Sequence, residues 1–105
     1  MKRGDVYWYT FQAPDKRRPV LIITRTSALT FLSGITIAPL TTTIRDIPTE
    51  VVLTPEEDGV PSRCAVNLDN LQTVQRRGLR RRITSLSPQR MDEVNAALLF
   101  ALGIN

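Results

Sequence analysis

Apolar residues recur along most of the chain in short runs that are typical of β-strands. Residues 6–11 are aromatic and β-branched, and residues 19–24 (Pro-Val-Leu-Ile-Ile-Thr) form an unbroken apolar run that is too short for a helix. We therefore expect a first strand over Val6–Phe11 and a second over Pro19–Thr24, buried on both faces, with Pro19 at its first position. Further extended segments are expected at Ile35–Leu40, Thr49–Leu53 and Cys64–Asn67, the last continuing through Leu68 and Leu71 to Val74, and at Ile83–Leu86.

Polar segments rich in turn residues separate these runs. Gln12–Arg18 contains Ala13-Pro14-Asp15, a turn signal, and Pro55–Asp58 is expected to be a loop between strands. No repeat or linker is visible. The whole chain, residues 1–105, is therefore expected to form a single domain.

The hydrophobic period changes near the end of the sequence. Ser87 is a good N-cap, Pro88 suits the first helical position, and Gly103 supplies a stop. Between them, apolar residues recur at helical spacing: Met91, Val94, Leu98 and Leu102. Strands followed by one amphipathic helix predict an α+β fold, a small and mostly antiparallel barrel or half-barrel. The helix is apolar over a wide arc, so we expect part of it to contact a partner subunit.

Composition limits the classes of chemistry. The 105 residues contain no histidine and a single cysteine, Cys64, which excludes Ser-His-Asp hydrolases, Cys-His proteases, zincins and histidine-dependent ribonucleases. No metal site and no cofactor are expected. The longest apolar run, Ala96–Leu102, is too short to cross a bilayer, and no signal peptide is visible. With no intrachain disulfide possible, we expect a cytoplasmic protein.

The net charge and the positions of the arginines bear on which ligands the protein binds. The formal net charge is +4, and twelve of the fourteen basic residues are arginine, whose planar fork of donors matches phosphate. Arginine replacing lysine in a GC-rich genome would give the same composition. Lys16-Arg17-Arg18 precedes the second expected strand, and Arg76–Arg82 holds five arginines in seven residues. That second cluster is either a nucleic-acid footprint or a solvated turn, and the lack of an interleaved aromatic residue favours the turn.

Five segments carry a resemblance to a known family. In order they are Arg-Gly-Asp-Val-Tyr-Trp (3–8), Arg-Arg-Pro-Val-Leu-Ile-Ile (17–23), Ala-Pro-Leu-Thr-Thr-Thr (38–43), Ile-Pro-Thr-Glu-Val (47–51) and Val-Asn-Leu-Asp-Asn-Leu-Gln-Thr-Val (66–74). With the C-terminal helix, the chain resembles the MazF/PemK toxin endoribonucleases over residues 3–103. The resemblance implies an SH3-like β-barrel with added helices, a homodimer, metal-independent cleavage of single-stranded RNA, and inhibition by a cognate antitoxin. The expected target is mRNA, with tRNA or rRNA as alternatives.

The resemblance also implies a catalytic pair. The family's functional arginine precedes Pro-Val and its threonine follows Ala-Pro-Leu, which places them here at Arg18 and Thr41. RNA supplies its own nucleophile, because the 2′-OH can attack the adjacent phosphorus and leave a 2′,3′-cyclic phosphate and a 5′-OH. The protein then has to supply orientation and positive charge. Arginine is a poor base near neutral pH, so the general base stays open between Arg18, a carboxylate such as Asp69, and a water molecule.

The expected substrate-binding residues are Lys16, Arg17, Arg25, Thr42, Thr43, Asn67, Asn70 and Gln72. Alternatives remain for several of them. Arg25 could instead pair with Asp46, and the two threonines could serve only the turn. In one strand, Asn67 and Asp69 would face away from Asn70 and Gln72, so they cannot all read bases. Tyr7, Trp8 and Tyr9 are expected to be core or dimer contacts rather than base-stacking residues.

One rival interpretation is a binding module of the same fold without chemistry, such as a gyrase-targeting toxin. That branch would be expected to act through an exposed, tryptophan-rich C-terminal tail. This chain ends in Leu-Gly-Ile-Asn and carries both members of the expected catalytic pair, which favours the ribonuclease.

Overall fold

The computed structural model describes residues 1–12 and 16–104. The elements in chain order are β1 (Asp5–Thr10), β2 (Arg17–Ile22), the 3₁₀ turn η1 (Thr26–Ala28), β3 (Gly34–Thr41), β4 (Glu50–Leu53), α1 (Pro55–Asp58), β5 (Cys64–Asn67), β6 (Gln72–Gln75), the 3₁₀ turn η2 (Arg76–Gly78), β7 (Arg81–Ser85) and α2 (Pro88–Leu102). The expected turn at Ala13-Pro14-Asp15 lies outside the described residues.

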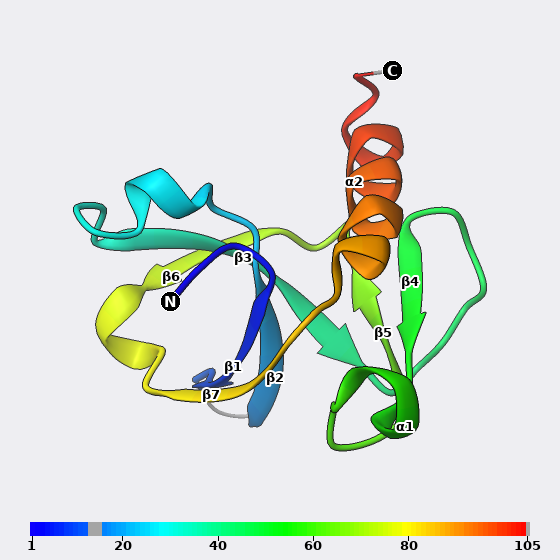
Figure 1. Cartoon of the computed structure of the whole chain (residues 1–105), viewed down its shortest axis with the longest axis horizontal. Helices are drawn as coiled ribbons and strands as arrows, with labels where there is room; N and C mark the ends of the chain where they lie inside the picture. The colour runs from blue at the N-terminus through cyan, green and yellow to red at the C-terminus, as the bar shows by residue number, and fades with distance from the viewer. Residues whose placement is uncertain (13–15, 105) are drawn as a thin grey trace.

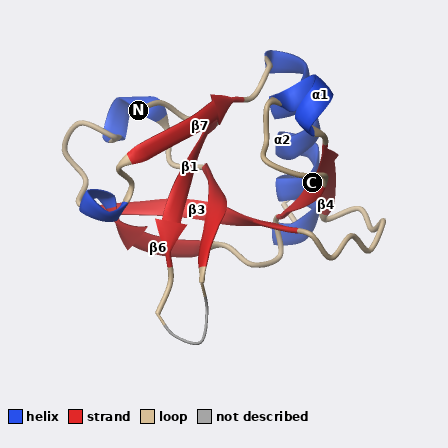
Figure 2. Cartoon of the chain, turned by 90° about the horizontal axis from the view of Figure 1, so that it is seen from below, coloured by secondary structure: helices blue, strands red, loops and turns tan. Residues whose placement is uncertain are grey.

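The strands form one curled antiparallel sheet. Their order is β4-β5-β3-β2-β1-β7, and β6 also pairs with β3. Strand β3 is long enough to pair with β6 and β2 along its first part and with β5 at its end. Figures 1 and 2 show the resulting half-barrel, with β6 and β7 on two sides of the curl, joined by η2, and with α2 standing beside β4 and β5. The predicted α+β half-barrel with a C-terminal helix is therefore confirmed.

Strand β2 is buried on both faces, as its unbroken apolar run predicts. Leu21 belongs to a first core cluster, which includes Val94 and Ala97 of α2. Val20 and Ile22 point the other way into a second cluster, against which the side chains of Tyr7, Tyr9 and Phe11 pack. The predicted core role of the two tyrosines is confirmed.

Three local expectations are wrong. Pro19 is the third residue of β2, paired with Trp8 of β1. It is tolerated because β2 pairs with β3 only from Val20 onward, so no ladder is interrupted on that side. Residues 66–74 do not form one strand, because the chain turns between β5 and β6, where the amide of Asn70 donates to the carbonyl of Asn67 at 3.3 Å.

The third correction concerns Pro55–Asp58, which is a short helix and not a loop. The Thr54 side chain accepts a hydrogen bond from the amide of Glu57 at 3.2 Å, and Gly59 ends the turn at a φ of 75°. Pro55 at the first helical position completes the capping pattern. These signals are present in the sequence, but one helical turn is too short to show a hydrophobic period.

Helix α2 has the predicted ends. Ser87 Oγ accepts a hydrogen bond from the amide of Arg90 at 3.1 Å, Pro88 stands at the first position, and Gly103 takes the left-handed conformation. In the part of the chain that the structure describes, no helix has the length and hydropathy needed to span a membrane.

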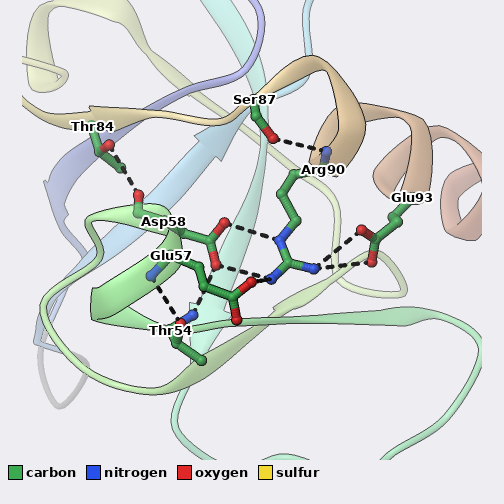
Figure 3. A network of polar contacts seen from close by, with 7 residues as sticks. All are labelled: Thr54, Glu57, Asp58, Thr84, Ser87, Arg90 and Glu93. Carbon is green, nitrogen blue, oxygen red and sulfur yellow. Dashed lines mark hydrogen bonds and ion pairs between the residues drawn. The ribbon is translucent and has the colours of Figure 1, made fainter.

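A polar network fixes this helix to the rest of the fold (Figure 3). The Asp58 carboxylate, only 4% exposed, accepts hydrogen bonds from Arg90 Nε at 2.9 Å and from the amide of Thr54 at 2.9 Å. The carbonyl of Asp58 accepts from Thr84 Oγ1 at 3.0 Å, and Arg90 also pairs with Glu93 at 3.1 Å. The network therefore ties α1, β7 and α2 together.

Two groups in this part of the fold have raised pKa values. The hydrogen bond that Arg90 donates to the Asp58 carboxylate raises the pKa of Arg90. Burial, with a smaller contribution from the negative charge of Asp58, raises the pKa of the Cys64 thiol to about 11. Cys64 therefore stays a neutral, buried thiol near pH 7 and contributes packing rather than nucleophilic chemistry.

Candidate functional site

A hollow of about 120 Å³ opens at the start of β2. Its lining residues are Phe11, Arg18, Pro39, Asn70 and Gln72. They come from four separate segments, namely the end of β1, β2, β3 and the β5–β6 turn with the start of β6. The hollow therefore exists only in the folded chain, and it combines one cation, one aromatic ring and two amides.

Strand alternation explains where Arg18 lies. Arg18, Val20 and Ile22 share one face of β2, and the latter two are fully buried in the second core cluster. Arg18 is half-buried and is the first of these three residues, at the end of β2 that reaches the surface. Its backbone position is fixed by a core that does not shift easily, while its charged head reaches the surface.

Two aromatic rings support the arginine. Tyr9 lies directly opposite Arg18 in the β1–β2 pairing. The Tyr9 and Phe11 rings meet edge to face with their centroids 4.9 Å apart, and the Arg18 guanidinium carbon lies 6.0 Å from the Phe11 centroid. A cation at this distance from a ring is weakly attracted to its face. Phe11 thus forms one wall of the hollow, and Tyr9 packs behind it.

Thr41 is the last residue of β3 and does not line this hollow. The β2–β3 pairs end at Val20 and Pro39, and Thr41, two residues further along β3, pairs with Ala65 of β5. Thr41 Oγ1 accepts a hydrogen bond from the amide of Thr43 at 3.1 Å. That bond fixes the oxygen and leaves the hydroxyl proton available to donate. Thr42 and Thr43 follow as exposed residues.

The predicted amide residues separate into two groups. Asn70 and Gln72 line the hollow, and Gln72 Nε2 donates to Asn70 Oδ1 at 3.4 Å. Asn67 lies elsewhere, since its Oδ1 accepts from the amide of Asp69 at 3.0 Å. Asp69 in turn accepts from Thr49 Oγ1 at 2.6 Å. Asn67 and Asp69 therefore hold the turn, whereas Asn70 and Gln72 present donors and acceptors to the hollow.

The remaining predicted cations lie outside the hollow. Lys16 and Arg17 are exposed, and the Arg17 guanidinium stacks 4.2 Å from the centroid of the Trp8 ring. Arg25 lies at the start of η1 and lines a different groove, beside Leu98 and Leu102 of α2. Among the described residues it forms no ion pair with Asp46.

The site combines positive charge with hydrogen-bonding amides and has no carboxylate. None of the lining residues is acidic, and the Arg18 guanidinium has no carboxylate within 4.0 Å among residues 1–12 and 16–104. Over the same residues, no cluster of three or more His, Cys, Asp or Glu side chains could hold a metal ion. Such a hollow can bind a phosphate and stabilise added negative charge on it.

Sequence reasoning missed Phe11 and Pro39. The alternation of Tyr7, Tyr9 and Phe11 in the sequence could have identified Phe11, because it places all three rings on one face of the first expected strand. Pro39 is the residue of β3 opposite Val20, and no local pattern marks it as part of a site.

Comparisons with known proteins agree with this architecture. A family profile described as PemK-like, MazF-like toxin of type II toxin-antitoxin system matches residues 2–102. A Mycobacterium tuberculosis protein named probable endoribonuclease MazF2 is 40% identical over 103 residues, covering 98% of this chain and 99% of the relative. Another, named probable endoribonuclease MazF5, is 41% identical over 100 residues, covering 95% and 91%.

Solved structures are similar over almost the whole chain. The Mycobacterium tuberculosis toxin MazF-mt6 superposes with a TM-score of 0.86 at 32% identity, covering 96% of this chain and 98% of that one. A mycobacterial endoribonuclease in complex with its cognate antitoxin superposes with a TM-score of 0.87 at 30% identity, covering 100% and 97%.

Proposed function

The chain belongs to the PemK-like, MazF-like toxins of type II toxin–antitoxin systems, and from this premise we infer that it is an endoribonuclease. It cleaves single-stranded RNA at short sequence motifs without a metal ion and thereby inhibits translation and growth. The observation that carries this function is the acid-free hollow in which Arg18 lies beside Phe11, Asn70 and Gln72. A cation for the phosphate, a ring for stacking and amides for base edges are what cleavage of an unpaired RNA segment requires.

The proposed reaction is an internal transfer of the phosphoryl group. The 2′-oxygen of the RNA forms a bond to phosphorus, the bond from phosphorus to the 5′-oxygen breaks, and a cyclic phosphate and a 5′-OH result. The 2′-OH gives up a proton, and the leaving oxygen gains one. Arg18 binds the non-bridging oxygens, where negative charge grows, and the Thr41 hydroxyl donates to one of them. Arg18, and behind it a water molecule, can return the proton to the leaving oxygen.

Two candidates for the general base remain in this proposal. Asp69 is held by Thr49 and does not line the hollow, so we do not assign it the proton of the 2′-OH. Arg18 and a water molecule remain as the two candidates. We assign substrate contacts to Asn70 and Gln72 inside the hollow, and to Lys16, Arg17, Thr42 and Thr43 at its margins.

Two protein partners complete the proposed function. A cognate antitoxin blocks the RNA site, by analogy with the mycobacterial relative solved with its own antitoxin. A second copy of the chain covers exposed apolar residues of α2, of which Phe100 and Leu102 are 54% and 53% exposed. A stable monomer at micromolar concentration in sedimentation would contradict the homodimer. We place the protein in the cytoplasm, where its RNA substrate lies and where Cys64 stays reduced.

The test is incubation of the purified protein with a long single-stranded transcript in EDTA, followed by analysis of the product ends. We expect discrete fragments with cyclic phosphate and 5′-OH ends, and their loss in Arg18→Ala and Thr41→Ala. Arg63→Ala is the matched control, because Arg63 is exposed on the α1–β5 connection and lines no part of the hollow. No cleavage by folded, antitoxin-free protein would instead support a binding module of the same fold.

A further inference from the structure

Four arginines of residues 76–82 lie, together with Arg17, at one exposed edge of the sheet. Strand β7 ends the strand order, and among the described residues it pairs with β1 alone. We call the following five exposed residues the arginine edge: Arg17, Arg77, Arg80, Arg81 and Arg82. They come from β2, η2, the connection between η2 and β7, and β7, so the edge is assembled by folding and is wider than the run of arginines in the sequence.

Folding also brings aromatic rings to this edge. Trp8 of β1 lies opposite Arg81 of β7, and the guanidinium of Arg17 stacks on the Trp8 ring at 4.2 Å. On the neighbouring side, Tyr9, Thr10, Gly78 and Arg80 line a hollow of about 290 Å³. The sequence run contains no interleaved aromatic residue, but the strand pairing supplies two from β1. The arginine edge therefore has the neighbouring aromatic rings that a nucleic-acid-binding surface needs and a solvated turn does not.

The charge of the edge is not compensated within the described residues. All four ion pairs recorded there involve Arg45 or Arg90. Arg80 Nε donates to the carbonyl of Arg77 at 3.1 Å and Arg82 Nη1 donates to Ser85 Oγ at 2.9 Å, contacts that orient the side chains without neutralising them. Like charges on neighbouring positions repel and cost stability. An anion that spans the edge would remove that cost.

We propose that the arginine edge is a second RNA-binding surface, which holds phosphates of the substrate outside the cleaved segment. Arg17 and Arg18 are consecutive in β2 and point to opposite faces of the sheet. The start of β2 therefore joins the hollow to the edge, and one strand of RNA can continue from Arg18 over Arg17 towards Arg81. Guanidinium forks match phosphates bidentately, and the Trp8 ring suits an unpaired base better than it suits an acidic peptide.

This inference rests on the proposed function, and its test separates the two. Once a cut site has been mapped, two RNAs carrying the same cut site are compared, one with minimal flanks and one with single-stranded flanks of about 20 nucleotides on each side. The variant is Arg77→Gln/Arg81→Gln, because within residues 1–12 and 16–104 neither guanidinium donates a hydrogen bond and the fold should not depend on them. Lys2→Gln/Arg63→Gln removes the same charge from exposed positions elsewhere.

We expect the wild-type protein and the control to cleave the long RNA at several-fold lower KM than the short one at low salt. In Arg77→Gln/Arg81→Gln this advantage should disappear, while kcat and the cleavage of the short RNA stay unchanged. Two lost phosphate contacts should also make the salt dependence of long-RNA binding shallower by about 1.4 in the log–log slope. Binding is measured on RNAs with a single 2′-deoxynucleotide at the cut site, which cannot be cleaved.

Three results would overturn the second surface. The first is a wild-type KM that does not depend on flank length, and the second is an equal loss in the control variant. The third is a variant with normal long-RNA binding that escapes inhibition by the antitoxin, which would assign the edge to a protein partner. If the wild-type protein binds the uncleavable long RNA through Arg77 and Arg81 but cuts neither substrate, the proposed catalysis fails while the binding surface stands.

Discussion

Two regions of this molecule contain arginine charge, and among the described residues carboxylates neutralise it in one region but not in the other. In the network around Arg90, the guanidinium is surrounded by the carboxylates of Asp58, Glu57 and Glu93 at 2.9 to 3.5 Å. On the arginine edge, five guanidinium groups face solvent and, within the described residues, no carboxylate neutralises them. The residue type is the same in both regions, and only the surroundings differ.

The difference separates structural from functional charge. An arginine whose donors are all used inside the protein contributes to the fold, and removing its partner leaves a buried charge. An arginine left uncompensated contributes little to the fold and remains available for a phosphate. Arg18 belongs to the second kind, although its backbone is fixed by the core. The count of arginines in a sequence cannot make this distinction.

Removing a buried carboxylate from the network around Arg90 should give the largest loss of stability. Asp58→Ala removes the carboxylate that faces Arg90 and the amide of Thr54, and we expect it to lower the free energy of unfolding by about 3–5 kcal/mol. Urea unfolding followed by circular dichroism measures this. Glu93→Gln, on an exposed carboxylate of the same network, should change stability by less than about 1 kcal/mol. Equal effects of the two variants would contradict the buried role of Asp58.

Removing the uncompensated arginine of the hollow should affect rate and leave stability intact. Arg18→Ala should lower the single-turnover cleavage rate by about 10²–10³-fold, which corresponds to about 3–4 kcal/mol of transition-state stabilisation. The unfolding free energy should stay within about 0.5 kcal/mol of wild type, because the side chain has no ion-pair partner in the described structure. A large loss of stability would show that the Arg18 side chain, like that of Arg90, stabilises the fold.

Gly78→Ala tests the packing between the arginine edge and the hollow. A Cβ at Gly78 would lie 2.6 Å from Cε1 of Tyr9, and the Tyr9 ring rests on Phe11, which lines the Arg18 hollow. We expect a loss of about 1–3 kcal/mol in stability, as for other overpacked sites. Cleavage of even the short RNA should weaken, because Phe11 moves. Unchanged unfolding and cleavage would show that the ring adjusts without cost.

Alkaline titration tests the burial of the Cys64 thiol. The folded thiol has a pKa raised from 9.0 to about 11, so between these values the unfolded chain loses its proton first. Stability should therefore fall as the pH rises from about 9 to 11, by at most about 1.4 kcal/mol per pH unit from this group. The difference in unfolding free energy between wild type and Cys64→Ala should show this slope. A difference independent of pH would contradict it.

The smallest expected effect lies on the arginine edge. Arg77→Gln/Arg81→Gln should change the unfolding free energy by no more than about 0.5 kcal/mol, and any change should be an increase, because like charges are removed. Thermal unfolding without RNA is the measurement. A clear destabilisation would mean that the edge, like the Arg90 network, is already used inside the fold.

Local pattern was sufficient for most of the fold. The strand Cys64–Asn67 and the ends of α2 follow from β-propensity and from capping residues that act on their immediate neighbours. Double burial of β2 followed from its unbroken apolar run. The turn after Asn67 was missed because alternation was extended through polar residues. The bond from the Asp69 amide to Asn67 Oδ1, a side-chain turn, interrupts it.

The candidate site was predicted only in part. Arg18 and Thr41 came from the family resemblance; Arg18 lines the hollow, whereas Thr41 ends β3, where it pairs with Ala65 of β5. The contacts that join Arg81 to Trp8, or Phe11 to Arg18, depend on strand pairing between distant segments. No single window of sequence contains that information.

The double burial of β2 has a consequence for hydrogen exchange. Because Leu21 belongs to one core cluster while Val20 and Ile22 belong to the other, neither cluster can open while β2 stays in place. The amides of these residues should exchange only through global unfolding and be among the slowest in the protein. Arg18 lies two residues before this segment, so its backbone should keep its place while more peripheral parts of the molecule open locally.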